Sequence, residues 1–144
     1  MRNATPTEHW EQVQLFKWAS ARPELSLMYA VPNGGHRDIR VAAKLKAEGV
    51  KPGVPDICLP VARGGFHGLY IELKRRKGGR VSPEQMLWIE ALMREGYACA
   101  VCLGWQEARR TIEEYMEDAS NDEGGIHPAA ERFGDAPAGT GADR

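Results

Sequence analysis

Two acidic residues and a lysine are the strongest candidates for chemistry in this sequence. Asp56 follows a proline, and sixteen residues later Glu72 and Lys74 stand on either side of Leu73. Alternate residues of a strand point to one face, so we expect the Glu72 and Lys74 side chains to lie together. If the segments around Asp56 and Glu72 pair as a hairpin, their carboxylates become neighbours, which repel each other unless a cation lies between them. Oxygen ligands of this kind favour Mg²⁺ or Mn²⁺, so the spacing predicts a metal site.

The chemistry that such a site could perform is phosphodiester hydrolysis. A metal held by Asp56, Glu72 and the backbone carbonyl of Leu73 could polarise a phosphodiester and lower the pKa of a bound water. Lys74 could position that water or neutralise charge that builds on the phosphate oxygens. The competing interpretation is that Glu72 and Lys74 only form the polar face of an ordinary strand. The Pro-Asp pair at hairpin distance favours the site.

The N-terminal helix offers a further acid. At about 100° per residue, Glu8 and Gln12 share a face with the apolar Leu15, which predicts that Glu8 points inward to the site. The alternative is that Glu8 only completes a capping box with Thr5. Glu11 lies off this stripe and is the second choice for the first-helix acid.

Gln85 presents the same ambiguity on a later helix. It aligns with Ile89 and Leu92 and so points inward, but it is also the third-position residue of a capping box that begins at Ser82. We favour a role in the site, because the neighbouring candidates support it.

Basic residues surround the predicted site although the whole chain has a net charge of -1. Residues 33–80 carry eleven Lys and Arg against four Asp and Glu, a net charge of +7, whereas residues 113–144 carry two against nine, a net charge of -7. Clustered cations attract phosphate backbones without reading sequence, whereas isolated ones are usually only solvated. The candidate DNA contacts are Arg37, Arg40, Lys44, Lys51, Arg75, Arg76, Lys77 and Arg80.

The elements that must position these residues alternate between helix and strand. Cap and turn residues together with apolar periodicity predict helices over 5–21, 38–48, 82–96 and 105–116, and strands over 27–31, 56–61, 69–74 and 99–103. We expect the second helix to pack through Ile39, Ala42, Ala43 and Leu45. This order predicts an α/β sandwich with a mixed sheet over residues 5–117. Residues 118–144 form an acidic, Gly- and Ala-rich tail that we expect to be disordered.

Several other classes of protein are disfavoured. The odd number of cysteines, three, argues against a disulfide framework and for a reducing compartment. Cys99 and Cys102 form a CxxC motif on a predicted buried strand, where residues three apart face opposite sides and cannot share a metal. The four histidines lack ligand spacing. No apolar run approaches the roughly 20 residues of a membrane span, and residues 1–7 lack a secretory pattern, so we expect a cytoplasmic protein.

Together these motifs resemble the VRR-NUC branch of the PD-(D/E)XK nucleases. The matching pieces, in family order, are Glu8 with Gln12, Pro32-Asn33-Gly34-Gly35, the segment 49–56 that ends in Asp56, Tyr70-Ile71-Glu72-Leu73-Lys74, and Ser82-Pro83-Glu84-Gln85. The strings around Asp56 and Glu72 are the specific ones. The resemblance implies a restriction-endonuclease-like fold and a Mg²⁺- or Mn²⁺-dependent DNA endonuclease without an organic cofactor. It also implies an active-site set of Glu8, Asp56, Glu72, Lys74 and Gln85.

The resemblance further suggests a substrate. Stand-alone members of this size, of the kind found in bacteriophages, are similar to homodimeric Holliday-junction resolvases, which implies branched DNA and two copies of the chain. The acidic tail has no counterpart in the family pattern. Two alternatives stay open: a nicking, flap or end-directed nuclease, and a DNA-binding factor that kept the fold without catalysis. The complete set of Asp56, Glu72 and Lys74 argues against the second.

Overall fold

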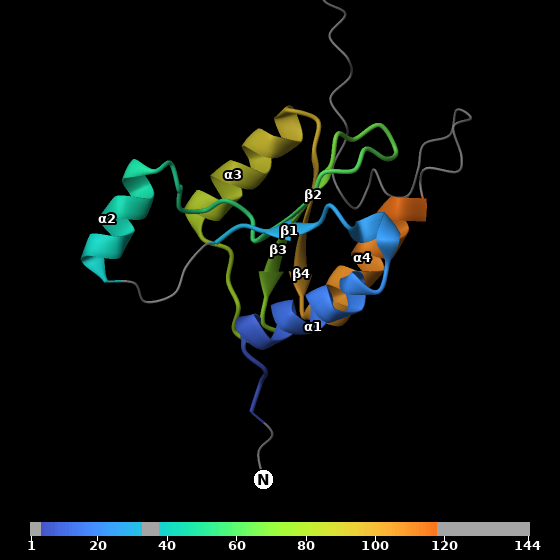
Figure 1. Cartoon of the computed structure of the whole chain (residues 1–144), viewed down its shortest axis with the longest axis horizontal. Helices are drawn as coiled ribbons and strands as arrows, with labels where there is room; N and C mark the ends of the chain where they lie inside the picture. The colour runs from blue at the N-terminus through green and yellow to red at the C-terminus, as the bar shows by residue number, and fades with distance from the viewer. Residues whose placement is uncertain (1–3, 33–37, 118–144) are drawn as a thin grey trace, which may run out of the picture.

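The computed structural model describes residues 4–32 and 38–117, and the elements alternate in the predicted order (Figure 1). The predicted turn at residues 33–35, the candidate contact Arg37 and the predicted acidic tail lie outside the described residues. The elements are α1 (Glu8–Ser20), a 3-10 turn η1 (Pro23–Leu25), β1 (Tyr29–Ala30), α2 (Ile39–Ala47), β2 (Ile57–Leu59), β3 (Leu69–Lys74), α3 (Pro83–Arg94), β4 (Ala98–Leu103) and α4 (Trp105–Glu117). Among these elements, no helix is long and apolar enough to cross a membrane.

The four strands form one mixed sheet in the order β1-β2-β3-β4. The pairs β1·β2 and β2·β3 are antiparallel, and β3·β4 is parallel. The predicted hairpin and the predicted mixed sheet are therefore confirmed. Ile57 pairs with Ile71 in the hairpin, so the preceding residue Asp56 comes opposite Glu72.

Helices cover both faces of the sheet, α1 and α4 on one and α3 on the other (Figure 1). The two cysteines of β4 mark the two faces. Cys99 Sγ contacts the backbone oxygen of Ile89 on α3 at 3.8 Å, and Cys102 Sγ contacts Thr111 Oγ1 on α4 at 3.5 Å. The prediction that these sulfurs point apart is confirmed, and the three cysteines are buried and form no disulfide bond.

Helix α1 begins differently from the prediction. Thr7, not Thr5, is the N-cap, and its hydroxyl accepts a 3.1 Å hydrogen bond from the backbone N–H of Trp10. The buried residues are Glu11, Leu15 and Ala19, whereas Glu8 is exposed. The prediction that Glu8 points inward is wrong. A spacing of four residues places Glu11 above Leu15 as well, and apolar periodicity alone cannot say which polar residue continues the stripe.

Helix α2 also differs from the prediction. None of its residues is buried, Ile39 is 85% exposed and Val41 is 48% exposed. Figure 1 shows α2 standing apart from the sheet and the other helices. The expected packing of Ile39, Ala42, Ala43 and Leu45 against the core is therefore wrong. An amphipathic pattern indicates that a helix has an apolar face, but it does not specify what covers that face.

Candidate active site

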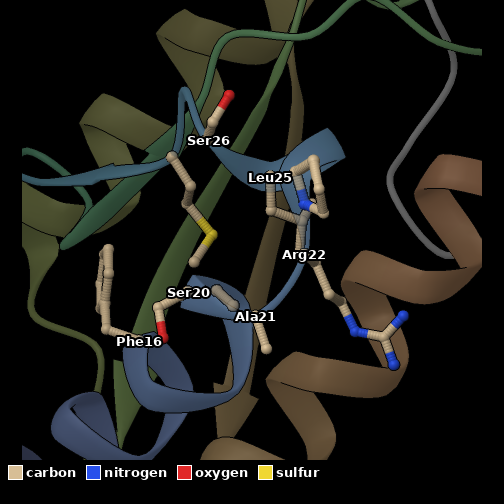
Figure 2. A pocket seen from close by; sticks show the side chains of 9 residues that line it. Phe16, Ser20, Ala21, Arg22, Leu25 and Ser26 are labelled. Carbon is tan, nitrogen blue, oxygen red and sulfur yellow. The ribbon is translucent and has the colours of Figure 1, made fainter.

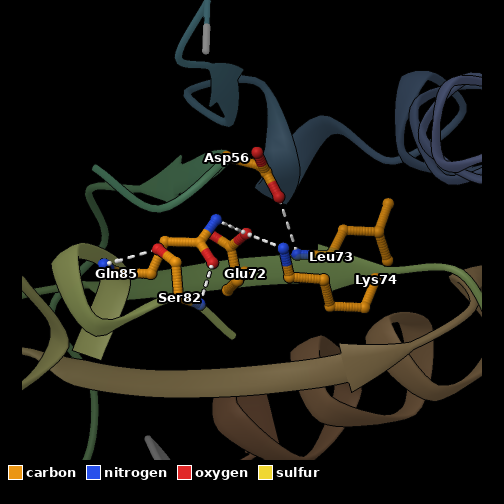
Figure 3. A network of polar contacts seen from close by, with 6 residues as sticks. All are labelled: Asp56, Glu72, Leu73, Lys74, Ser82 and Gln85. Atoms are coloured by element: carbon orange, nitrogen blue, oxygen red, sulfur yellow. Dashed lines mark hydrogen bonds and ion pairs between the residues drawn. The ribbon is translucent and has the colours of Figure 1, made fainter. Parts of the chain in front are cut away.

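Asp56 is attached to β3 by its side chain. Its Oδ2 atom accepts a 2.9 Å hydrogen bond from the backbone N–H of Leu73 (Figure 3). The ladder of the hairpin runs only from Ile57 to Leu59, so the carboxylate satisfies a donor of β3 beyond the end of β2. The backbone of Asp56 is held from the other side, where its oxygen accepts a 2.7 Å bond from Val31.

The hydrogen bond from the Leu73 N–H to the Asp56 carboxylate also defines the direction of the Leu73 carbonyl. The N–H and C=O groups of one strand residue point to the same neighbouring strand. Because the Leu73 N–H points to Asp56, the Leu73 carbonyl lies on that same side, where β2 has already ended. The predicted backbone ligand thus belongs to the same side of β3 as the Asp56 carboxylate.

The segment before Asp56 packs against α3. Gly53 has a φ of +89°, and a side chain there would meet the Glu84 backbone at 2.9 Å and the Trp88 ring at 3.0 Å. Only glycine combines this backbone conformation with so close an approach. The contact sets the position of Asp56 relative to the helix that carries Gln85.

The two carboxylate oxygens of Glu72, which is only 1% exposed, have different surroundings. Its Oε1 atom accepts a 2.6 Å hydrogen bond from Gln85 Nε2 and lies 3.2 Å from Lys74 Nζ (Figure 3). Its Oε2 atom is buried and accepts no hydrogen bond among the described residues, although a protonated Glu72 can share its proton with the neighbouring Asp56 carboxyl. An unpartnered buried carboxylate oxygen is costly. A divalent cation with hard oxygen preference would satisfy this atom, so the residues present fit a metal.

The pKa values of Asp56 and Glu72 are both raised, so the site does not easily hold two negative charges. Burial, and then the negative charge of Asp56, raises the pKa of Glu72 to about 7, although the nearby Lys74 opposes the shift. Burial also raises the pKa of Asp56, against the lowering effects of the Leu73 N–H bond, of a side-chain hydrogen bond with Glu72 and of Lys74. Two carboxylates that resist ionising together are typical of a site that gains from a bound cation.

Gln85 has both of the roles that the sequence left open. Its Oε1 atom accepts a 2.8 Å bond from the Ser82 N–H, and its own backbone N–H donates to Ser82 Oγ at 3.2 Å, which completes the capping box of α3. Its Nε2 atom donates to Glu72 at 2.6 Å. One side chain therefore caps the helix and holds the acid.

The two acids of α1 lie at different depths. Glu8 is exposed, yet its charge is close enough to contribute to the raised pKa of Asp56, so it lies at the edge of the candidate site. Glu11 is fully buried, and its partners are structural: the backbone N–H of Trp105 at 2.7 Å and Arg76 Nε at 3.0 Å. The spacing of four residues from Glu11 to Leu15 indicates that Glu11 is buried, but it does not indicate these partners.

The predicted DNA contacts divide into two groups. Arg76 contacts other side chains, Glu11 and Gln106 Oε1 at 2.5 Å, although its own side chain is 42% exposed. The other described candidates are exposed as well: Arg40, Lys44, Lys51, Arg75, Lys77 and Arg80. Three of these, Arg75, Lys77 and Arg80, follow directly on the strand that carries Glu72 and Lys74.

Two other features of the described residues do not contribute to the site. Among the residues that the structure describes, no group of three or more His, Cys, Asp or Glu side chains is arranged to hold a metal ion. A hollow of about 320 Å³ lies between α1 and η1 (Figure 2). It is lined by Phe16, Ala19, Ser20, Ala21, Arg22, Pro23, Leu25, Ser26 and Met28, and none of these residues is a candidate for catalysis.

Comparison with known proteins decides the family. The model of the VRR-NUC domain family matches residues 3–106, a range that holds Glu8, Asp56, Glu72, Lys74 and Gln85. The chain belongs to the VRR-NUC domain family. A similar solved structure is that of a protein named "VRR_NUC domain protein", with 31% sequence identity, a TM-score of 0.71 and coverage of 81% of this chain and 93% of that chain. No curated protein gave a significant sequence match.

Membership of the VRR-NUC family fits the structure described above. The mixed four-stranded sheet between helices is the predicted restriction-endonuclease-like α/β fold, which is thereby confirmed. The family also implies a nuclease-type function with DNA as the substrate, as the resemblance of the motifs suggested.

Proposed function

We propose that this VRR-NUC protein is a metal-dependent DNA endonuclease that hydrolyses phosphodiester bonds at Asp56 and Glu72. The observation that carries the proposal is the buried Oε2 atom of Glu72, which has no hydrogen-bond partner in the described part of the chain and lies on the residue opposite Asp56. A binding protein without catalysis has no physical need for this costly arrangement.

Three groups of the chain would hold Mg²⁺ or Mn²⁺: the Glu72 Oε2 atom, the Asp56 carboxylate and the Leu73 carbonyl. Such an ion would supply a Lewis acid that polarises the phosphodiester and lowers the pKa of an attacking water. Lys74, whose ammonium is 3.2 Å from Glu72 Oε1, neutralises charge that builds on the phosphate oxygens. Glu8, whose charge acts on Asp56 from the edge of the site, would contact the water or a second cation.

The exposed cations Arg75, Lys77 and Arg80 would bind the DNA backbone beside the scissile phosphate. They extend from the end of β3, so phosphates that contact them lie next to the carboxylates. Contacts of this kind position the duplex without reading its sequence. Arg40 and Lys44 on α2 and Lys51 after it would bind DNA farther from the site.

Branched DNA is the substrate that we propose, cut by a homodimer. The support is the resemblance of the chain to stand-alone resolvases, and a two-fold pair of sites would cut two strands of a four-way junction symmetrically. Sedimentation of the protein with and without junction DNA tests the dimer. A monomer in both conditions would leave a nicking, flap or end-directed nuclease.

The test of the activity uses labelled four-way junction, flap and linear duplex with Mn²⁺, Mg²⁺ or EDTA. Wild-type protein should cut in the presence of metal, with paired symmetric nicks in the junction, and Glu72→Ala should not. A matched control, Glu90→Ala, changes an exposed acid on α3 and should cut normally. If wild type and Glu72→Ala bind DNA equally in EDTA and neither cuts any substrate, the chain is a DNA-binding factor instead.

A further inference from the structure

The unequal surroundings of the Glu72 carboxylate have a structural origin. Gln85 and Lys74 both contact Oε1, at 2.6 Å and 3.2 Å, and leave Oε2 without a partner in the described chain. If either donor moved to Oε2, the atom that we assign to the metal would be blocked. The orientation of the Gln85 amide is therefore decisive for the site.

The backbone of Ser82 determines that orientation. An amide group presents an acceptor oxygen at one end and a donor nitrogen at the other, and its neighbours determine which end is which. The Ser82 N–H can only donate, so the end of Gln85 that meets it at 2.8 Å is the oxygen. The nitrogen of Gln85 must then face Glu72, to which it donates. A reversed amide would set two donors against each other at one end and two acceptors at the other.

The hydroxyl of Ser82 fixes the same residue a second time. Ser82 Oγ accepts a 3.2 Å hydrogen bond from the backbone N–H of Gln85, so backbone and side chain of Gln85 are both tied to Ser82 (Figure 3). Ser82 itself is the N-cap of α3 and is followed by Pro83, which restricts the first turn of the helix. The cap thus forms a rigid ring of two hydrogen bonds next to the site.

We propose that Ser82 is a positioning residue of the nuclease site: through Gln85 it holds Glu72 by Oε1 and keeps Oε2 free for a divalent cation. This inference rests on the proposed function. A helix cap by itself only stabilises α3. Here we assign the cap a second role, which is to raise the affinity of the protein for the metal. Residues that orient metal ligands typically change affinity by about 10- to 100-fold when they are replaced.

Ser82→Pro tests the positioning role. Proline has no N–H, so this variant removes the donor that orients the Gln85 amide, and the extended backbone of Ser82, with φ -75° and ψ 160°, accommodates a proline. Ser82→Gly is the paired variant, because it also loses the cap hydroxyl but keeps the backbone N–H and is nearly as good an N-cap as serine. We expect Mn²⁺ binding, measured by calorimetry on the full chain without DNA, to weaken about tenfold in Ser82→Pro and to stay close to that of wild type in Ser82→Gly. In metal-free protein, the side-chain NH₂ of Gln85 should exchange faster with solvent in Ser82→Pro than in Ser82→Gly.

Asp38→Gly is the matched control. Asp38 caps α2 through a comparable bond, in which its carboxylate accepts from the Arg40 N–H at 2.8 Å, but it has no link to Glu72. Its Mn²⁺ affinity should equal that of wild type. If wild type binds Mn²⁺ and cuts DNA while Ser82→Pro keeps full affinity and normal amide exchange, the role of Ser82 is overturned and the proposed function stands. If wild type binds no Mn²⁺ and cuts nothing, both are overturned.

Discussion

The fully buried carboxylate of Glu11 accepts a 2.7 Å hydrogen bond from the backbone N–H of Trp105, 94 residues away in the chain. The same carboxylate pairs with Arg76 at 3.0 Å. Glu11 therefore joins α1 to the start of α4 and to the basic segment that leaves β3. Its contacts are structural, whereas the metal site that we propose is formed by Asp56 and Glu72.

Glu11→Ala should strongly destabilise the fold. The substitution leaves the Trp105 N–H without its buried acceptor, which costs about 1 to 3 kcal/mol, whereas the Arg76 guanidinium, 42% exposed, is solvated by water. Urea unfolding measures the loss. Glu8→Ala, at an exposed position three residues earlier, should change stability by no more than about 0.5 kcal/mol. Equal losses in the two variants would contradict the structural role of Glu11.

Metal binding should depend on pH through Glu72. Because the pKa of Glu72 is raised from 4.5 to about 7, protons compete with the cation below that pH. Mn²⁺ affinity should fall up to about tenfold for each pH unit below 7 and level off above it. Calorimetry at pH 6, 7 and 8 measures this, and the same affinity at all three values would refute it.

The stability of the metal-free protein should fall as the pH rises, whereas its metal affinity rises. Its folded state binds a proton at Glu72 more tightly than the unfolded chain does, so this group lowers the free energy of unfolding as pH rises from about 4.5 to about 7. Saturating Mn²⁺ should reverse that loss above pH 7, because the cation takes the place of the proton. Melting curves across this range with EDTA or Mn²⁺ test the sign, and a metal-free melting temperature that rises through the window would be inconsistent with the buried acid.

Single changes in the exposed basic segment should weaken DNA binding without affecting the fold. Lys77→Ala and Arg80→Ala should each lower the salt dependence of binding by about one ion, because each removes one phosphate contact. Fluorescence anisotropy against KCl concentration, in EDTA, gives the slope. Arg110→Ala, at an exposed position on α4, is the matched control and should leave the slope unchanged. If all three variants behave alike, these cations are not the DNA contacts.

The cysteines should be chemically silent in the native protein. All three are buried, and burial raises the pKa of the Cys99 thiol to about 12, so almost no reactive thiolate forms at neutral pH. A thiol-specific chromogenic reagent should modify the cysteines only as the protein unfolds. The rate of modification should therefore equal the rate of unfolding. Rapid modification in native conditions would mean that the sheet opens locally.

The local parts of this structure could be predicted from the sequence. The hairpin follows from two strand patterns and a glycine loop, and the α3 cap follows from the Ser82 to Gln85 spacing, because both depend on residues close in the chain. The position of Asp56 opposite Glu72 then follows from the hairpin. The sequence did not show that Gln85 both caps α3 and contacts Glu72, because either role alone would account for a glutamine at this position.

The errors concern residues whose partners are distant. The buried Glu11 accepts a hydrogen bond from Trp105 and pairs with Arg76, and the sequence around α1 contains no trace of either partner. Helix α2 has the pattern of a packed helix, yet Ile39 is exposed in the structure. In both cases the local pattern identifies the helix correctly, and the surroundings of its side chains depend on the whole fold.

The most direct test of the metal site is a crystal of the protein soaked in Mn²⁺, measured at a wavelength where manganese scatters anomalously. The account predicts one strong peak at about 2.1 Å from Glu72 Oε2, the Asp56 carboxylate and the Leu73 carbonyl, and none in Glu72→Ala. A peak remote from these atoms, or no peak in a protein that still cuts DNA in EDTA, would contradict it.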